Sequence, residues 1–450
     1  MKNTAILYVP SDTPEAMTVA TKKVAGVPII LRGVMTLAQA GIDRCILLMA
    51  GSQKETIERF LPKFSKQNLP EIEYVLYDEP YRVSPDTVKR ITSLVGEKSV
   101  LVNADFIFEQ ELVSILFERP DANSKVIQFA QSTGSLPFYS VPKFVWEELS
   151  DFTAQKPRSI ESCIHFLAEK NAIVFIKKPV EVNTFLVTRQ RDRAVAEKAL
   201  AETIRHRIDG PVARHINKRL SLPASLIMAK LWISPNAITA MNIIIGVFSG
   251  VFVADGHRYA VILLGAILFQ IASIVDGCDG EVAKLTFRCT KFGQYADTLC
   301  DNLSLGSFIT GLIAGYWRHT HSPVAFIVGA VLVLATALIF FWMIRYLKKN
   351  TDSASFVTFD KQYLSRLQKQ PAWLLTVIKY GKYTLKKDVF SFMFLCFAFF
   401  GVLYWWLFIA AFGTVIAALI LTYLNLSEML TARKMGMVSR VKSFSEGGNS

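Results

Sequence analysis

Two short stretches of sequence, separated by eight residues, decide how the second half of this chain folds and what chemistry it carries. They read Asp276-Gly-Cys-Asp279-Gly280-Glu-Val-Ala283-Lys284 and Gly293-Gln-Tyr-Ala-Asp297-Thr-Leu-Cys-Asp301. The first pair of aspartates has the spacing i, i+3 and the second pair i, i+4, so each pair lies on one face of a helix. Long uncharged runs flank both stretches. A carboxylate beside such a run is costly and indicates a function by default.

Four carboxylates that converge from two neighbouring helices repel one another unless cations neutralise them. Hard divalent cations prefer oxygen ligands, and two such ions can bridge and orient phosphate oxygens. The sequence therefore predicts a site for two ions. Gly293 lies one turn before Asp297 on the same face, where a side chain would obstruct the close approach of a ligand. Carboxylates beside a membrane also serve cation or proton transport, so a transporter, or an inactive scaffold, is the alternative.

The uncharged runs predict helices that cross a membrane. They cover residues 236–254, 259–275, 303–317, 324–344 and 389–424. The last run is too long for one span, because a helix of that length at about 1.5 Å per residue would exceed a hydrocarbon core of about 30 Å. It is expected to be a hairpin that turns near residues 401–406. We therefore expect an all-α domain of six transmembrane helices over residues 233–430.

The charge balance indicates a membrane surface as partner. Lysine and arginine number 50 against 37 aspartates and glutamates, a net charge of +13. These cations lie beside the apolar runs, which favours a lipid bilayer over nucleic acid. They gather on one side of a six-span topology, so the positive-inside rule places both termini and the aspartates in the cytoplasm. In a bacterium the membrane would be the inner one. Residues 201–232 predict a basic amphipathic helix in the headgroup layer, and 431–450 a basic cytosolic tail.

The two stretches resemble the signature of the CDP-alcohol phosphotransferase (CDP-alcohol phosphatidyltransferase) family. That signature is D-x-x-D-G-x-x-A-R, then about eight residues, then G-x-x-x-D-x-x-x-D, and seven of its eight fixed positions match. The departure is Lys284, where the family has arginine. Lysine keeps the charge and loses the planar fork that binds phosphate through two hydrogen bonds. The segment Ser234-Pro235-Asn236-Ala-Ile238-Thr239 also resembles the start of the family's first span.

The resemblance implies an enzyme that moves a phospho-alcohol group from a CDP-alcohol to the hydroxyl of a polar alcohol or phospho-alcohol acceptor and releases CMP. It implies two Mg²⁺ or Mn²⁺ ions and a homodimer. The implied metal ligands are Asp276, Asp279, Asp297 and Asp301. The implied CDP-binding residues are Asp276, Gly280, Ala283, Lys284, Gly293 and Asp297. Asp301 would also act as general base on the acceptor hydroxyl.

The substrates stay open at this point. CDP-diacylglycerol and CDP-inositol are the candidate donors; inositol phosphate, glycerol phosphate and another polar alcohol are the candidate acceptors. Arg345, Lys386 and Lys387 lie at the expected cytoplasmic ends of spans four and five. They could bind an anionic acceptor, or they could be anchors that reach toward the headgroups.

Residues 1–200 predict a different structure, a cytosolic α/β domain with a mostly parallel, doubly wound sheet. Strands are expected at 5–9, 45–50, 73–77 and 99–103, and helices at 28–40, 53–64 and 85–95. Alternating strands and helices are typical of this Rossmann-like class.

The segment Lys23-Val-Ala-Gly26-Val-Pro28, with the helix and Ala40-Gly41-Ile42 that follow it, resembles sugar-phosphate nucleotidyltransferases. Joined to the second half, it resembles bifunctional enzymes that combine an inositol-1-phosphate cytidylyltransferase with a di-inositol-phosphate phosphate synthase. That family has a glycine-rich phosphate loop and two metal aspartates. Here the loop reads Pro10-Ser-Asp-Thr-Pro-Glu-Ala-Met-Thr, and proline removes N–H donors.

Asp105 fits the first metal aspartate, and the neutral Asn183 stands in the place of the second. We therefore expect a degenerate site around Lys23, Asp105 and Asn183 that forms no CDP-alcohol from CTP. Retained cytidylyltransferase activity is the alternative.

Overall fold

The computed structural model describes most of the chain, as two compact units. The described residues are 2–9, 21–64, 69–77, 82–131, 134–154, 158–160, 162–163, 166, 170, 173–180, 182–187, 189–206, 212–350 and 387–446. The α/β unit comprises Met1–Ile208, Leu222–Pro235 and Cys278–Lys291. The helical unit comprises Asp209–Ser221, Asn236–Gly277 and Phe292–Ser450. The last of these segments, Cys278–Lys291, includes Asp279 to Lys284 of the first aspartate stretch.

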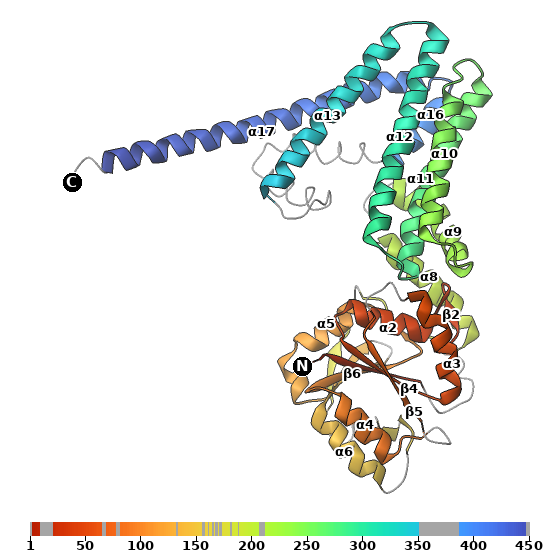
Figure 1. Ribbon diagram of the computed structural model, residues 1–450, viewed down its shortest axis with the longest axis vertical. Helices are drawn as coiled ribbons and strands as arrows, with labels where there is room; N and C mark the ends of the chain where they lie inside the picture. Colours follow the sequence, from red (N-terminus) through yellow and green to blue (C-terminus); the bar gives the residue numbers. More distant parts are fainter. Residues whose placement is uncertain are drawn as a thin grey trace. The chain divides into compact units, whose positions relative to one another are not determined.

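A seven-stranded sheet forms the centre of the α/β unit (Figure 1). Its strands are β1 (Thr4–Tyr8), β4 (Arg44–Met49), β5 (Glu71–Leu76), β6 (Lys98–Asn103), β8 (Ile127–Gln131), β9 (Gly134–Pro142) and β10 (Val174–Lys177). They lie in the order β10-β8-β9-β6-β1-β4-β5. β9 pairs antiparallel with β6 and β8, while the other pairings are parallel. The mostly parallel sheet predicted from the sequence is confirmed.

Helices cover both faces of this sheet. They are α2 (Ile29–Gln39), α3 (Gly51–Phe60) and α5 (Gln110–Glu118) on one face and α4 (Pro85–Leu94) and α6 (Lys143–Ala154) on the other. Successive side chains of a strand point to opposite faces, and β1 shows the result. Ala5 and Leu7 are buried in the core under α2, and Ile6 and Tyr8 in the core under α4 and α6. The expected doubly wound architecture is therefore present.

Smaller elements complete the α/β unit. A short antiparallel hairpin joins β2 (Lys23–Val24) to β3 (Val27–Pro28), and β7 (Phe106–Ile107) pairs with β11 (Phe185–Leu186). Three further helices follow along the chain: α8 (Gln190–His206), the five-residue π-helix η3 (Ala213–Asn217) and α9 (Lys218–Lys230). Only the part of α9 from Leu222 onward belongs to the α/β unit.

The helical unit consists mainly of long apolar helices. They are α10 (Pro235–Val253), α11 (Tyr259–Leu285), α12 (Lys291–Thr320), α13 (Val324–Asn350), α16 (Lys387–Phe399) and α17 (Trp405–Glu446). Within the described part of the chain, four of them are long and apolar enough to cross a membrane: α10, α11, Val324–Trp342 of α13 and Trp405–Tyr423 of α17. The helix break between α16 and α17 agrees with the expected hairpin. These four candidate spans support a membrane domain, and the number of six transmembrane helices stays a prediction.

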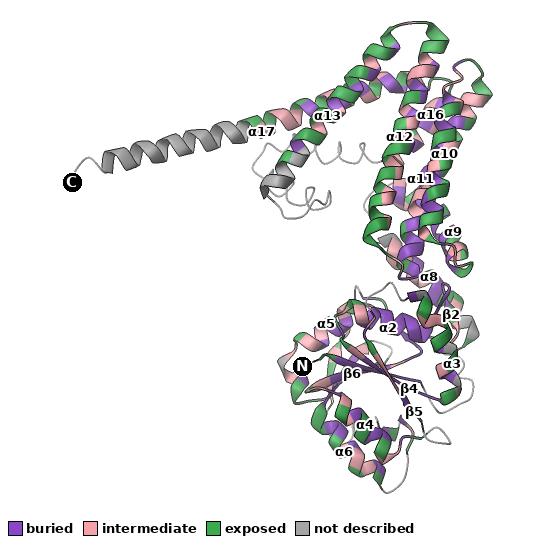
Figure 2. Ribbon diagram, in the orientation of Figure 1, coloured by how far each residue is buried: buried purple, intermediate pink, exposed green. Residues whose placement is uncertain are grey.

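Small residues and stacked rings pack the interior of the helical unit. A Cβ on Gly311 of α12 would lie 2.2 Å from the carbonyl oxygen of Gly250 on α10, so these backbones are in direct contact. The rings of Phe269 on α11 and Phe308 on α12 stack, and the ring of Phe394 on α16 packs against both. Figure 2 shows exposed residues along the other faces of these helices, many of them large and apolar. An apolar exposed face is what a lipid-embedded helix presents.

Candidate metal centre

Three of the four predicted metal aspartates come together in the helical unit. Asp276 projects from α11, and Asp297 and Asp301 project from α12, one turn apart. One carboxylate oxygen of each lies within 4.8 Å of the others. Oxygen ligands of one Mg²⁺ ion lie about 2.1 Å from the ion. Their mutual distances can therefore reach about 4.2 Å, so small side-chain movements would close this set around a cation.

Two polar side chains from other helices contact the three carboxylates. Asn242, fully buried on α10, donates its Nδ2 to Asp276 Oδ1 at 2.8 Å and to Asp301 Oδ1 at 3.5 Å. The ammonium of Lys387, at the start of α16, lies 3.3 Å from Asp276 Oδ1 and also contacts Asp301. Carboxyl groups outnumber the ammonium three to one in this group. A dication is the partner that such a group would accept at low cost.

Sequence reasoning did not single out Asn242. Together with Lys387, its amide contacts both Asp276 and Asp301. Such hydrogen bonds to the ligands of a metal fix their geometry. The available signal was a polar side chain within the uncharged run 236–254. Its Oδ1 has no hydrogen-bond partner among the described residues, which leaves an acceptor close to the carboxylates.

The remaining motif residues lie along the last turns of α11 and at the start of α12. Asp279 is buried and belongs to the α/β unit, three residues after Asp276 on the same helix. A Cβ on Gly280 would meet nothing within 4 Å, so open space adjoins that backbone. Ala283 is buried and Lys284 is exposed. Gly293 is partly buried in the first turn of α12. The contacts of Gly280, Ala283, Lys284 and Gly293 with CDP stay a prediction.

The three cations predicted to bind an acceptor have different environments. Lys387 contacts Asp276 and Asp301. The guanidinium of Arg345 lies 5.9 Å from the ring centroid of Trp342 on its own helix α13. Lys386 lies outside the described residues.

The predicted degenerate site of the α/β unit contains one unusual carboxyl group. Asp105 follows β6, is 3% exposed, and its Oδ1 has no partner among the described residues. Burial raises the pKa of Asp105 to about 7, against the opposing effect of the positive charge on Lys22.

The other two residues of that site make contacts of their own. Asn183 donates its Nδ2 to Thr203 Oγ1 at 3.2 Å and to Glu109 Oε1 at 3.4 Å. The Lys23 ammonium lies 4.8 Å from the ring centroid of Phe60. The loop at residues 10–18 lies outside the described residues.

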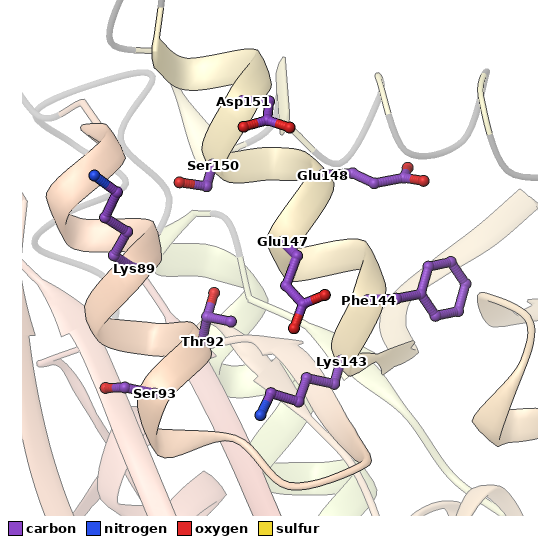
Figure 3. Close-up of a pocket in the computed structure, with 9 residues that line it drawn as sticks. All are labelled: Lys89, Thr92, Ser93, Lys143, Phe144, Glu147, Glu148, Ser150 and Asp151. Atoms are coloured by element: carbon purple, nitrogen blue, oxygen red, sulfur yellow. The ribbon is translucent and has the colours of Figure 1, made fainter.

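A surface hollow of about 730 Å³ lies between α4 and α6 of the α/β unit (Figure 3). Lysines and carboxylates both line it, among them Lys89, Lys143, Glu147 and Asp151. Neither charge dominates, and none of the residues predicted from the sequence lies there. The hollow therefore indicates no particular ligand.

Comparisons with known proteins agree with the two stretches. Residues 232–424, which include both, match the model of the CDP-alcohol phosphatidyltransferase family. The bifunctional IPC transferase and DIPP synthase of Thermococcus kodakarensis is 30% identical over 131 residues, 29% of this chain and 28% of that protein. The Aquifex aeolicus enzyme of the same name is 32% identical over 142 residues, 31% of this chain and 32% of that protein.

A CDP-diacylglycerol–serine O-phosphatidyltransferase of Helicobacter pylori is 36% identical over 89 residues, 19% of this chain and 36% of that protein. The chain thus spans about a third of the length of these relatives. Among solved structures, one assigned as a glucose-1-phosphate thymidylyltransferase from Bacillus anthracis is 12% identical with a TM-score of 0.36. It covers 44% of this chain and 95% of that one.

Proposed function

We propose that the chain is an integral membrane CDP-alcohol phosphotransferase that transfers a phospho-alcohol group to an acceptor hydroxyl and releases CMP. The observation that carries the proposal is the group of Asp276, Asp297 and Asp301, which meet within a segment matched by the CDP-alcohol phosphatidyltransferase family. Three carboxylate ligands that lie this close together fit divalent cations. Cation-bound carboxylates next to open space suit the pyrophosphate of a CDP-alcohol.

In this proposal Asp276, Asp279, Asp297 and Asp301 hold two Mg²⁺ or Mn²⁺ ions. The ions, when bound, neutralise charge on the donor's phosphates. Asp301 accepts the proton of the acceptor hydroxyl, whose oxygen forms a bond to the β-phosphorus as the bond to CMP breaks. Asn242 orients Asp276 and Asp301 through its amide. Gly280, Ala283, Lys284 and Gly293 line the CDP pocket.

The position of Lys387 supports an anionic acceptor. Its ammonium contacts the carboxylates of Asp276 and Asp301, and cations that bind there would displace it. The ammonium would then be free to bind a phosphate oxygen beside the general base. An acceptor such as inositol phosphate carries both the hydroxyl and the phosphate, so we favour it over an uncharged alcohol. CDP-inositol and CDP-diacylglycerol are the proposed donors, in keeping with the activities for which the relatives are named.

The proposed setting is a bilayer crossed six times, with α12 and α16 added to the four candidate spans. Both termini and the aspartates would lie on the cytoplasmic side, with the basic segment 201–232 in the headgroup layer and a homodimer as the active form. The α/β domain would form no CDP-alcohol. Asn183, in the place of the second metal aspartate, is neutral and donates its Nδ2 to Thr203 and Glu109.

The test is CMP release by the full chain in lipid vesicles with Mg²⁺, against CDP-diacylglycerol and CDP-inositol paired with inositol phosphate and glycerol phosphate. Release with one pair supports the proposal and identifies both substrates. No release with any pair, together with metal-dependent ion flux across the vesicles, would replace it with a transporter. In a separate arm, incubation with CTP and inositol-1-phosphate should release no pyrophosphate.

A further inference from the structure

The helix that carries the first aspartate stretch ends in a strained turn within the α/β unit. Phe287, just after α11, has φ +57°, a backbone conformation that bulky L residues rarely adopt. The Arg288 N–H donates to Ala283 O at 2.8 Å, and the Phe287 N–H points to Lys284 O at 3.4 Å. This pair of bonds is the Schellman motif, in which glycine is the usual residue at the left-handed position. A strained residue persists there only if its surroundings hold it.

The core of the α/β domain provides those surroundings. Phe287 is buried in the hydrophobic core that α2 and the sheet form. The guanidinium of Arg32 on α2 lies 5.2 Å from the centroid of the Phe287 ring. Trp232, which precedes α10, packs on the same core and meets the ring of Phe64 edge-on. The α/β domain therefore encloses the turn that terminates α11.

Arg32 also caps the end of α11 directly. It is the one charged residue of α2, is 4% exposed, and lies on a helix that is buried along its length (Figure 2). Its Nη2 donates to Leu285 O at 2.9 Å and to Val24 O at 2.8 Å. Leu285 O belongs to the last turn of α11, whose carbonyls have no partner within the helix, and a cation there opposes the helix dipole.

Burial of the charged Arg32 side chain costs free energy, so its hydrogen bonds to the end of α11 must offset that cost. Burial lowers the pKa of Arg32 to about 10, although the charge of Glu197 acts in the other direction. A buried guanidinium is retained only where it gains strong hydrogen bonds. The bonds it makes here join the β2–β3 hairpin to α11.

The same hairpin contacts α8 and α9 closely. Glu197 of α8 accepts the Ala25 N–H at 3.0 Å and pairs with the Lys230 ammonium at 2.6 Å. Gly26 has φ +80°, and a Cβ there would lie 2.2 Å from the carbonyl oxygen of Ala229. The hairpin, α8, the second part of α9 and the end of α11 thus form one packed group.

We propose that the α/β domain positions the phosphotransferase motif by capping α11 through Arg32, whatever nucleotide chemistry the domain has of its own. Asp279, Gly280, Ala283 and Lys284 occupy the two turns that precede the cap. A firm cap fixes the direction of those turns and hence the donor pocket that they form. Arg32 is a positioning residue. Its effect on turnover rests on the proposed function, whereas the capping contact can be measured without any substrate.

The experiment uses Arg32→Met in the full chain in lipid vesicles, because methionine keeps much of the volume and removes the charge. Amide hydrogen exchange is measured for residues 278–291, and steady-state kinetics are measured with CDP-inositol or CDP-diacylglycerol. We expect the amides of Phe287 and Arg288 to exchange about tenfold faster, as loss of one charge-assisted hydrogen bond predicts. The KM for the donor should rise about tenfold and the KM for the acceptor should stay within about twofold, since the cap acts on the donor pocket.

Two other variants make the result specific. Arg32→Lys keeps a charge but reaches one carbonyl at a time, so its exchange rates and donor KM should fall between those of wild type and Arg32→Met. Arg32→Lys also replaces Arg32→Met as the test variant if the methionine variant does not fold. Arg119→Met removes an arginine of the same domain that pairs with Asp121 on the surface, and it should leave both measurements at wild-type values.

Unchanged exchange at residues 278–291 in Arg32→Met would overturn the capping role. Faster exchange over the whole α/β domain, with both KM values unchanged, would make Arg32 merely a core residue and would overturn the positioning role. If the wild-type protein releases CMP from neither donor, the proposed function fails, and the local exchange result still decides whether Arg32 caps α11.

Discussion

Asn242→Leu tests the metal centre with the least disturbance of the helices, since leucine matches asparagine in size and removes its amide. The variant loses a 2.8 Å hydrogen bond to Asp276 Oδ1 and a longer contact of 3.5 Å to Asp301 Oδ1. Only the first has the geometry of a strong bond. A bond to a charged group contributes about 1.5–3 kcal/mol. That free energy corresponds to a change of about 10- to 150-fold in metal affinity.

The assay is CMP release as a function of Mg²⁺ concentration, with Mn²⁺ binding followed by electron paramagnetic resonance as a measurement that needs no turnover. In Asn242→Leu we expect the half-saturating Mg²⁺ concentration to rise by about 10- to 150-fold. Asn425→Leu is the matched control, because Asn425 donates to Leu421 O within its own helix α17 and is not one of the residues that contact Asp276 or Asp301 in the described part of the chain. If Asn242→Leu bound Mg²⁺ as tightly as the control, the carboxylate group would not be the metal centre.

Three other predictions follow from the same structure. Asp297→Asn should reduce CMP release to background while the thermal unfolding transition of the protein stays in place, and unaltered turnover would exclude Asp297 as a metal ligand. Asp105 has its pKa raised from 3.8 to about 7, so the folded state favours the protonated form and stability falls as pH rises from about 4 to 7. Asp105→Asn should remove that fall, so the free energy of unfolding should exceed that of wild type by up to about 4 kcal/mol at pH 8. Chemical unfolding at several pH values measures this difference. A pH profile identical to that of wild type would contradict a buried carboxyl at Asp105. Gly311→Leu should lower the melting temperature through overpacking of about 1–3 kcal/mol or more, because its Cβ would lie 2.2 Å from Gly250 O, whereas Gly306→Leu on the same helix meets nothing within 4 Å and should be tolerated.

Much of the fold follows from local patterns. The strands β1, β4 and β6 and the helices α2 and α4 lie within one or two residues of their expected bounds. Hydrophobic periodicity and turn residues act over a few residues, so they are readable along the chain. The spacing of Asp297 and Asp301 likewise places them on one face of α12, and the structure brings Asp276 beside them.

The partners of those aspartates and the end of α11 depend on contacts that no local pattern encodes. Asn242 precedes Asp276 by 34 residues, and Lys387 follows Asp301 by 86. Arg32 is separated by 253 residues from the carbonyl that it caps. Periodicity tells which face of a helix is apolar, but the neighbour that packs against that face is chosen by the complementarity of whole surfaces. For that reason the motif and its chemistry can be read from the order of the residues, while the amide, the ammonium and the guanidinium that hold the motif in place emerge only when the helices pack.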